Sequence, residues 1–210
     1  MMRILLVDDH EIVRRGLKQL LADEFPRTSF GEATRVPEAR ALIAQKKWEL
    51  VLLDINLPGG SGLDLLAEVS RLCPQAAVLI LSSYPEEEFA VRAFKLGAAG
   101  YLTKASVADE MLIAVKKVLA GGKYVSVSLA EKLAAALGNP KRAAPHETLS
   151  ARELEVLRLV ATGRTIKEIA AGLSLSEKTI ATYRSRVSEK LGLSTNVELA
   201  RYALQHRLVE

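Results

Sequence analysis

Three carboxylates, a lysine and a serine lie at the ends of short apolar runs in this 210-residue chain. The carboxylates are Asp8, Asp9 and Asp54, and Ser82 and Lys104 follow two later runs. Carboxylates that converge in one crevice repel each other, so they require a cation, and a ligand set of oxygen atoms favours Mg²⁺. A carboxylate nucleophile, a metal, a fixed ammonium and a hydroxyl are the groups needed to form and hold an acyl phosphate. The pattern therefore predicts a magnesium site with phosphoryl chemistry.

These side chains can converge only if the apolar runs are parallel strands of one sheet. The runs at 3–7, 50–53 and 78–81 are almost continuously apolar, as in strands buried on both faces, and 28–32 and 100–102 are predicted as flanking strands. Helical patterns alternate with them at 11–23, 37–46, 62–72, 86–96 and 107–119. This alternation predicts an α/β doubly wound sheet, whose ligand site lies at the carboxyl ends of the strands.

The rest of the chain is predicted to be a connection followed by a helical domain. Ser128 and Glu131 form a capping box that opens a short helix, and residues 138–148 have two prolines and no apolar period, which indicates a linker. Four further helices are expected at 151–162, 166–172, 177–191 and 196–206, with capping signals at Ser150, Thr165, Ser176 and Thr195. We expect domains at 1–120 and 149–210, joined by 121–148.

Two of these helices are joined by a turn of the length that helix-turn-helix units use, Leu173 to Ser176. One face of the 177–191 helix is apolar, and the opposite face is small and polar with basic edges, which suits base edges and phosphates. Periodicity alone does not distinguish a DNA-binding face on this helix from a polar face that is simply exposed to solvent. Residues 1–120 carry 15 basic and 16 acidic side chains, whereas residues 149–210 carry 10 and 7. This small positive excess is a weak indication of a polyanionic partner.

Composition restricts the class of protein further. Cys73 is the single cysteine, which excludes an internal disulfide framework and a cysteine-based zinc cluster and fits a reducing compartment. No apolar run approaches the roughly 20 residues that a membrane span requires. A cytoplasmic protein without a membrane partner is therefore expected.

Four ordered segments resemble the signature segments of response-regulator receiver domains. They are residues 6–10, 53–62, 81–82 and 97–104, within a similarity that covers about 1–120. The resemblance implies a flavodoxin-like (βα)5 fold with strand order 2-1-3-4-5. It also implies that Asp54 accepts a phosphoryl group from a sensor histidine kinase and that Lys104 pairs with the phosphate. The implied Mg²⁺ ligands are Asp8, Asp9, Asp54 and the backbone carbonyl of Asn56, and the implied switch pair is Ser82 and Tyr101.

The switch has a physical explanation. A phosphoryl group on Asp54 adds negative charge, the Ser82 hydroxyl moves to bond it, and Tyr101 turns into the vacated space. A half-buried Tyr101 with a wet hydroxyl is the structural alternative. The rival class is a phosphatase of the haloacid dehalogenase type, which needs a second acid where Asn56 stands, so we expect no enzyme. His10 is interpreted as a helix-start residue, and no triad or zinc set is expected from the three histidines.

The C-terminal helices resemble the LuxR-type helix-turn-helix over about 148–210. Residues 149–157, 166–170 and 175–180 carry this likeness, and with the receiver the chain resembles a NarL/FixJ-type response regulator. The likeness implies that the helix from Glu177 enters the DNA major groove. The candidate DNA contacts are Lys178, Thr179, Thr182, Arg184, Ser185, Arg186 and Lys190, with Thr182 and Ser185 facing bases and the cations facing phosphates.

The expected function is phosphorylation-dependent regulation of transcription in a bacterial two-component system. Phosphorylation of Asp54 is expected to promote dimerisation and promoter binding. The expected partners are the sensor histidine kinase, double-stranded promoter DNA, a second copy of the chain and RNA polymerase. A phosphorylation-responsive adaptor that acts through protein contacts is the alternative, with the helical domain as its binding module.

Overall fold

The computed structural model describes residues 1–84, 86–126, 129–131, 144–206 and 208–209. It divides into two compact units, Met1–Lys141 and Arg142–Glu210, and each unit is considered by itself. The start of the predicted connecting helix at Ser128, most of that helix and residues 138–143 of the predicted linker lie outside the described residues. Among these residues, no helix is both long and apolar enough to cross a membrane.

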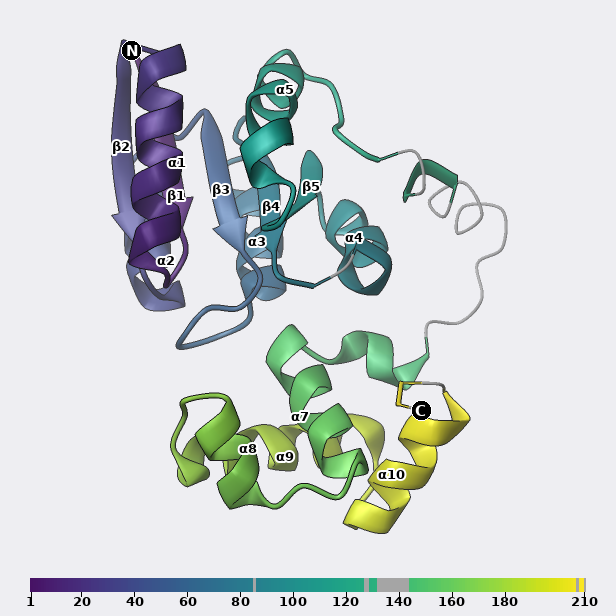
Figure 1. Ribbon diagram of the computed structural model, residues 1–210. Coiled ribbons are helices and arrows are strands. Elements are labelled where there is room, and N and C mark those ends of the chain that lie inside the picture. Colours follow the sequence, from purple (N-terminus) through teal and green to yellow (C-terminus); the bar gives the residue numbers. More distant parts are fainter. Residues whose placement is uncertain (85, 127–128, 132–143, 207, 210) are drawn as a thin grey trace. The chain divides into compact units, whose positions relative to one another are not determined.

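The first unit is built on a five-stranded parallel sheet. Its strands are β1 (Met2–Val7), β2 (Thr28–Ala33), β3 (Leu50–Asp54), β4 (Ala77–Ser82) and β5 (Gly100–Thr103), in the order β2-β1-β3-β4-β5 (Figure 1). Both the strand positions and the predicted order are confirmed. The three inner strands are the nearly continuous apolar runs of the sequence, as expected for strands that are covered on both faces.

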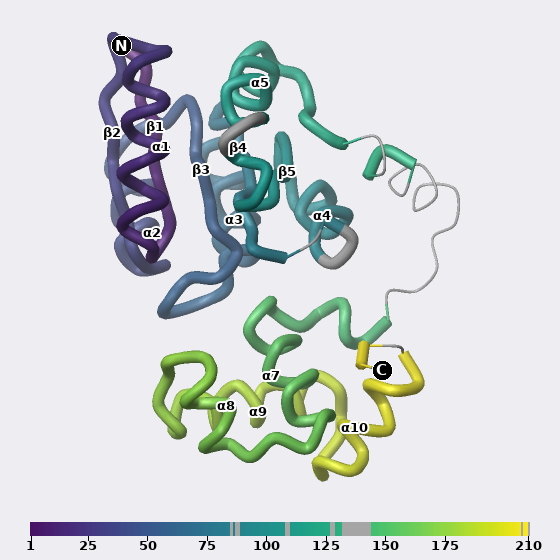
Figure 2. Tube along the Cα trace, in the orientation of Figure 1, coloured from purple at the N-terminus to yellow at the C-terminus, as the bar shows by residue number. Residues whose placement is uncertain are grey.

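Five helices alternate with these strands and cover both faces of the sheet. They are α1 (Glu11–Glu24), α2 (Val36–Gln45), α3 (Gly62–Leu72), α4 (Glu86–Lys95) and α5 (Val107–Leu119). Figures 1 and 2 both show α1 and α5 in front of the sheet and α3 behind it. Buried side chains of α1 and α5, such as Leu21 and Val115, pack with Leu6, Leu52 and Leu81 of the strands. This packing holds the strand ends, and therefore the site, in a fixed register.

The second unit contains the four predicted helices. These are α7 (Ala151–Ala161), α8 (Ile166–Gly172), α9 (Glu177–Leu191) and α10 (Asn196–Gln205). Ser150, Thr165 and Thr195 each accept the predicted bond from the third residue of their helix, and the glutamate there bonds back to the cap. The helix α9 ends at Leu191 and is capped by Gly192, whose left-handed φ of 67° suits glycine.

The end of the predicted linker is more regular than its composition indicated. Residues Pro145–Thr148, at the end of the predicted linker, form a 3₁₀ helix, η1. Proline fixes φ at the start of this turn, and the Glu147 carboxylate accepts a bond from the backbone N–H of Ala144 at 3.1 Å. The backbone N–H and Nδ1 of His146 lie 3.2 and 3.0 Å from the Tyr202 hydroxyl of α10. These contacts attach η1 to the helical unit.

Candidate functional site

The register of β1 and β3 brings the predicted acids together. Val7 pairs with Leu53 across the two strands, so Asp8 follows β1 directly beside Asp54, the last residue of β3. Side-chain atoms of Asp8, Asp9, Asp54 and the neighbouring His10 all lie within 4.8 Å of one another. Asp8 and Asp54 are almost fully buried, with 1% and 2% of their surface exposed. The structure thus places three carboxylates in one crevice at the carboxyl edge of the sheet.

Lys104 reaches the same crevice from the loop after β5. Its ammonium Nζ lies 2.7 Å from Asp54 Oδ2 and 2.7 Å from Asp8 Oδ2. Its backbone N–H donates to the carbonyl of Ser82 at 2.7 Å, which fixes the loop against the end of β4. One cation therefore bridges the acids of two neighbouring strands, as the sequence predicted for a fixed ammonium.

Burial dominates the ionisation of the predicted acceptor. The loss of solvent raises the pKa of Asp54 to about 6, although the charge and hydrogen bond of Lys104 act in the opposite direction. For Lys104 itself, burial favours the neutral form, but the carboxylates of Asp54 and Asp8 outweigh it and its pKa is raised. At neutral pH the pair is therefore a carboxylate beside an ammonium.

The donor set suits a hard divalent cation. Asp8, Asp9 and Asp54 offer carboxylate oxygens, and the predicted fourth ligand, the carbonyl of Asn56, belongs to the loop that leaves β3. The backbone N–H of Asn56 donates to Asp54 Oδ1 at 2.9 Å, which fixes this loop beside the acids. The side-chain oxygen of Asn56 is buried and has no hydrogen-bond partner among the described residues. Closely spaced oxygens of this kind fit Mg²⁺.

A glycine permits the close approach of the loop that carries Asn56. The N–H of Gly62, at the start of α3, donates to the carbonyl of Ile55 at 3.1 Å. A Cβ atom at position 62 would lie 2.4 Å from the Asp54 carbonyl oxygen and 2.7 Å from the Ile55 Cα atom. Only glycine therefore fits here without a shift of the backbone beside Asp54.

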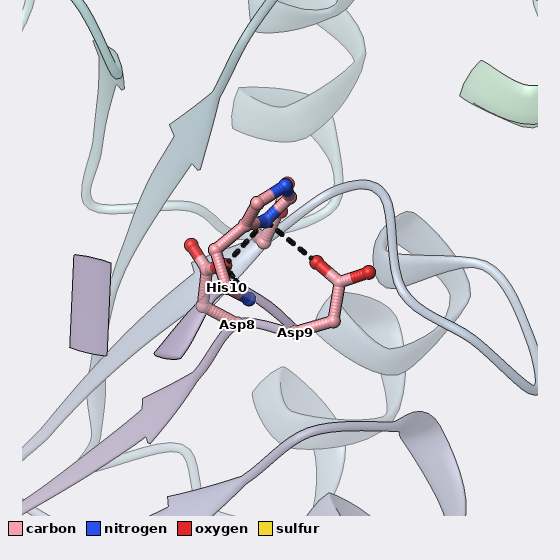
Figure 3. A group of neighbouring side chains, drawn as sticks. Asp8, Asp9 and His10 are labelled. Atoms are coloured by element: carbon pink, nitrogen blue, oxygen red, sulfur yellow. Dashed lines mark hydrogen bonds and ion pairs between the residues drawn. The ribbon is translucent and has the colours of Figure 1, made fainter. Parts of the chain in front are cut away.

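His10 belongs to the acidic cluster, which the sequence interpretation missed. Its Nδ1 atom lies 2.8 Å from Asp9 Oδ1 and 3.0 Å from Asp8 Oδ1, so the ring spans both carboxylates in Figure 3. His10 also stands at the N-cap of α1, as predicted. The signal in the sequence was its place directly after two acids. Asp8 folds back to accept the His10 backbone N–H at 2.8 Å, and this brings the ring over the carboxylates.

The two residues predicted as a switch pair contact the same neighbour, Tyr84. The buried Ser82 hydroxyl accepts the Tyr84 backbone N–H at 3.0 Å, and the Tyr101 hydroxyl donates to the Tyr84 carbonyl at 3.3 Å. Tyr101 has 0% of its surface exposed. The alternative of a half-buried ring with a wet hydroxyl is therefore wrong, and the ring already lies inside the protein in this conformation.

In the helical unit, α9 exposes most of the predicted DNA contacts. Lys178, Thr182, Ser185 and Arg186 are exposed, while Ile180 and Val187 face the core. Thr179 is half-buried, and its hydroxyl lies 2.7 Å from that of the cap residue Ser176. The solvent-facing surface of α9 is therefore polar and carries cations.

Two of the predicted phosphate contacts have partners within the unit. The Arg184 guanidinium donates to the Asn196 side chain at 3.0 Å and to the Ser194 carbonyl at 3.1 Å. The Lys190 ammonium lies 2.6 Å from the carboxylate of the buried Glu153 in α7. Both side chains therefore help to hold α9 against its neighbours.

Family models match both units. The model for the response regulator receiver domain matches residues 4–116, and the model for bacterial regulatory proteins of the luxR family matches residues 147–203. The response regulator GacA of Pseudomonas aeruginosa is 35% identical over 100% of this chain and 99% of its own length. The chain belongs to the response regulators.

Other relatives of this response regulator agree with that membership. The response regulator UvrY of Escherichia coli is 32% identical over 99% of this chain and 96% of its own length. A structure of RcsB from Salmonella typhimurium, a response regulator, has a TM-score of 0.61 at 25% identity and covers 97% of this chain and 100% of that one. A structure of two RcsB dimers bound to two parallel DNAs has a TM-score of 0.59 at 25% identity, and the match covers 97% of this chain and 98% of that one.

Family membership decides between the classes of function that the sequence left open. A receiver followed by a luxR-family DNA-binding domain makes this response regulator a phosphorylation-dependent transcription regulator and not an enzyme. The phosphatase alternative is thereby excluded. The asparagine at position 56, which cannot exchange a proton as an acid would, agrees with this conclusion.

Proposed function

We propose that Asp54 is the phosphoryl acceptor of this response regulator and that the donor is a sensor histidine kinase. The supporting observation is the buried Asp54 carboxylate, held 2.7 Å from Lys104 and beside Asp8. A carboxylate oxygen forms the new bond to phosphorus while the phosphorus–nitrogen bond of the donor phosphohistidine breaks, and the leaving imidazole keeps the electron pair and takes up a proton. Lys104 then pairs with the phosphoryl oxygens, because it is already bonded to the acceptor.

Asp8, Asp9, Asp54 and the backbone carbonyl of Asn56 would hold Mg²⁺ at this site. When bound, the ion supplies positive charge that offsets the negative charge of the phosphoryl group. The chain itself positions the acceptor through Lys104 and through the Asn56 N–H, which donates to Asp54 at 2.9 Å.

The signal is proposed to leave the site through Tyr84. The Ser82 hydroxyl turns from the Tyr84 N–H towards the phosphoryl oxygens, which removes its hydrogen bond to the Tyr84 backbone. The Tyr84 carbonyl still accepts the hydrogen bond of the inward Tyr101, so Tyr84 shifts while Tyr101 stays in place. Phosphorylation therefore stabilises the inward position of Tyr101 and alters the surface formed by α4 and β5.

The output is proposed to be binding of double-stranded promoter DNA by α9 in the major groove. The exposed Thr182 and Ser185 would face base edges, and Lys178 and Arg186 would meet phosphates. Thr179, Arg184 and Lys190 remain candidates for DNA contact, but each also has a bond within the unit. Their primary task is to hold α9 in place.

The remaining parts of the proposal concern organisation and partners. Residues 1–120 form the receiver domain, 121–148 the connection and 149–210 the DNA-binding domain. The phosphorylated chain forms a homodimer that binds paired half-sites and acts on RNA polymerase in the cytoplasm. The DNA-bound dimers described for the similar RcsB chain support this arrangement.

The receiver proposal is tested by incubation with acetyl phosphate and Mg²⁺, followed by intact-mass measurement of the phosphorylated fraction. Wild type is expected to take up one phosphoryl group, and Asp54→Asn none, because an amide has no carboxylate oxygen to offer. Asp64→Asn, which changes an exposed acid in the first turn of α3, is the matched control and should label like wild type. Equal labelling of wild type and Asp54→Asn would contradict the assignment.

The DNA proposal is tested by the salt dependence of binding to promoter fragments recovered in a genome-wide pull-down. A steep negative slope of log affinity against log salt is expected, and Arg186→Ala should reduce its magnitude by about 1. Thr182→Ala should instead change the preference among sequences. Arg164→Ala, at an exposed site between α7 and α8, is the control. An absent or flat salt response would contradict DNA binding.

A further inference from the structure

Two side-chain donors of the protein itself, Lys104 and His10, lie between the carboxylates of the acidic cluster. Lys104 lies between Asp8 and Asp54, at 2.7 Å from an oxygen of each. His10 fills the second gap, with Nδ1 at 2.8 Å from Asp9 Oδ1 and 3.0 Å from Asp8 Oδ1. Figure 3 shows the imidazole above the two aspartates. A positively polarised group therefore already lies between Asp8 and Asp54 and another between Asp8 and Asp9.

The direction of the His10 contact follows from its neighbours. Two carboxylate oxygens, which can only accept hydrogen bonds when ionised, lie closer to Nδ1 than the ammonium of Lys104, which is at 3.4 Å. Nδ1 therefore carries its proton and donates it to Asp8 Oδ1, while Asp9 Oδ1, at 2.8 Å, lies against the same ring and has no hydrogen-bond partner among the described residues. The imidazole thus partly covers both oxygens and makes them less available to any other electropositive group.

Those oxygens belong to the acids that the proposed Mg²⁺ site uses. Magnesium binds oxygen at about 2.1 Å and demands near-octahedral geometry, so an ion that takes Oδ1 of Asp8 and of Asp9 excludes the imidazole nitrogen, which lies within 3.0 Å of both. Binding at these two atoms is then accompanied by loss of the imidazole contact. The energy of that contact is then subtracted from the affinity of the site for the ion.

The His10 side chain is free to leave without disturbing the fold. Its side chain is 60% exposed, and within the described part of the chain it makes no capping hydrogen bond to α1. The backbone N–H of His10, not the ring, maintains the turn to Asp8. Rotation of the side chain into solvent therefore vacates the space between the two acids while the backbone stays in place.

We propose that His10 is a built-in placeholder that competes with the divalent cation for Asp8 and Asp9 and so sets how much Mg²⁺ the receiver needs. This inference rests on the proposed function, because it concerns the ion that phosphorylation of Asp54 uses. His10 stabilises the ion-free acids and weakens the affinity for the ion. It thereby shifts occupancy, and with it readiness for phosphorylation, towards higher Mg²⁺ concentrations.

The test is calorimetric titration of Mg²⁺ into the full chain at one fixed pH. His10→Ala is expected to bind Mg²⁺ about fivefold more tightly than wild type, which corresponds to one net hydrogen bond to a charged, partly exposed group. Arg15→Ala removes a full positive charge from the same helix without a contact to Asp8 or Asp9, and its affinity should stay within about twofold of wild type. An equal gain in Arg15→Ala would overturn the placeholder in favour of general electrostatics.

Other results for His10→Ala and for the His10 imidazole signals would also decide the matter. Unchanged affinity of His10→Ala would overturn the inference, and weaker affinity would show that the imidazole is a ligand. The imidazole ¹⁵N signals of His10 should shift on addition of Mg²⁺, while those of His206 in the other unit should not. Unmoved His10 signals at saturation would likewise contradict displacement.

If Asp9→Asn binds Mg²⁺ as wild type does, the proposed ion site fails, and the placeholder fails with it.

Discussion

Replacement of Lys190 by methionine should destabilise the helical unit, because its ammonium neutralises a buried carboxylate. Glu153 has 3% of its surface exposed, and one of its oxygens accepts the Ser150 N–H at 2.7 Å and the Lys190 ammonium at 2.6 Å. Methionine keeps the aliphatic packing of lysine, but of the two donors to this oxygen among the described residues it leaves only the backbone N–H of Ser150. The pair links the first turn of α7 to the last turn of α9, so its loss loosens the position of α9.

The size of the effect follows from the unequal burial of the two partners. Breaking a fully buried pair costs about 3 to 5 kcal/mol, because an uncompensated charge stays in the interior. The Lys190 side chain is 38% exposed, so solvent screens part of the interaction and some water can reach the vacated space. We therefore expect the free energy of unfolding of the helical unit to fall by about 2 kcal/mol.

Urea unfolding of the full chain can isolate this effect. Trp48, the single tryptophan, is buried in the first unit, so its fluorescence should report an unchanged midpoint. Far-ultraviolet circular dichroism and amide hydrogen exchange in α7 and α9 should show the loss. Glu153→Gln keeps the capping geometry without the charge, so the double variant with Lys190→Met should recover part of the loss.

Lys167→Met, at an exposed position of α8, is the matched control and should change stability by less than about 0.5 kcal/mol. The reasoning is refuted if Lys190→Met is as stable as this control. The clearest refutation would be a Lys190→Met variant of unchanged stability in which the slope of log affinity for DNA against log salt concentration is smaller in magnitude by about 1. Lys190 would then serve as a phosphate contact.

Two further predictions concern the first unit. Gly62→Ala should lower the free energy of unfolding by about 2 kcal/mol and slow phosphorylation, because the new Cβ would lie 2.4 Å from the Asp54 carbonyl oxygen. Gly16, in α1, has open space where a Cβ would be added, so Gly16→Ala is the control and should be neutral or stabilising in urea unfolding. Burial and a 2.6 Å bond to Glu110 raise the pKa of Tyr124 to about 12. Ultraviolet titration of Tyr124→Phe should therefore lack a tyrosine that ionises near pH 12 in the wild type, and the stability that Tyr124 contributes below pH 10 should disappear as the pH rises towards 12.

The convergence of the acids could be predicted because it depends on a regular feature. Parallel strands place their carboxyl ends at one edge, so strand-end positions for Asp8 and Asp54 already implied proximity. The helix boundaries of the second unit followed from capping boxes, which are local and need only residues three positions apart. Where the physical cause was local or periodic, the sequence sufficed.

The features that were missed depend on contacts between distant or unusually placed residues. The pair of Lys190 with Glu153 spans 37 positions and has no pattern in the sequence. The bridging position of His10 needed the backbone turn at Asp8, and the inward Tyr101 depends on a carbonyl 17 positions away. The short helix η1 also contacts Tyr202 of α10, and composition alone could not reveal this contact.

The central claim is that phosphorylation of Asp54 controls the binding of DNA by α9. It is tested most directly by the affinity for one recovered promoter fragment at fixed salt, measured with and without acetyl phosphate and Mg²⁺. The account predicts that the phosphodonor tightens binding by wild type and leaves Asp54→Asn unchanged. Equal affinities for wild type in the two conditions, or an equal gain in Asp54→Asn, would contradict it.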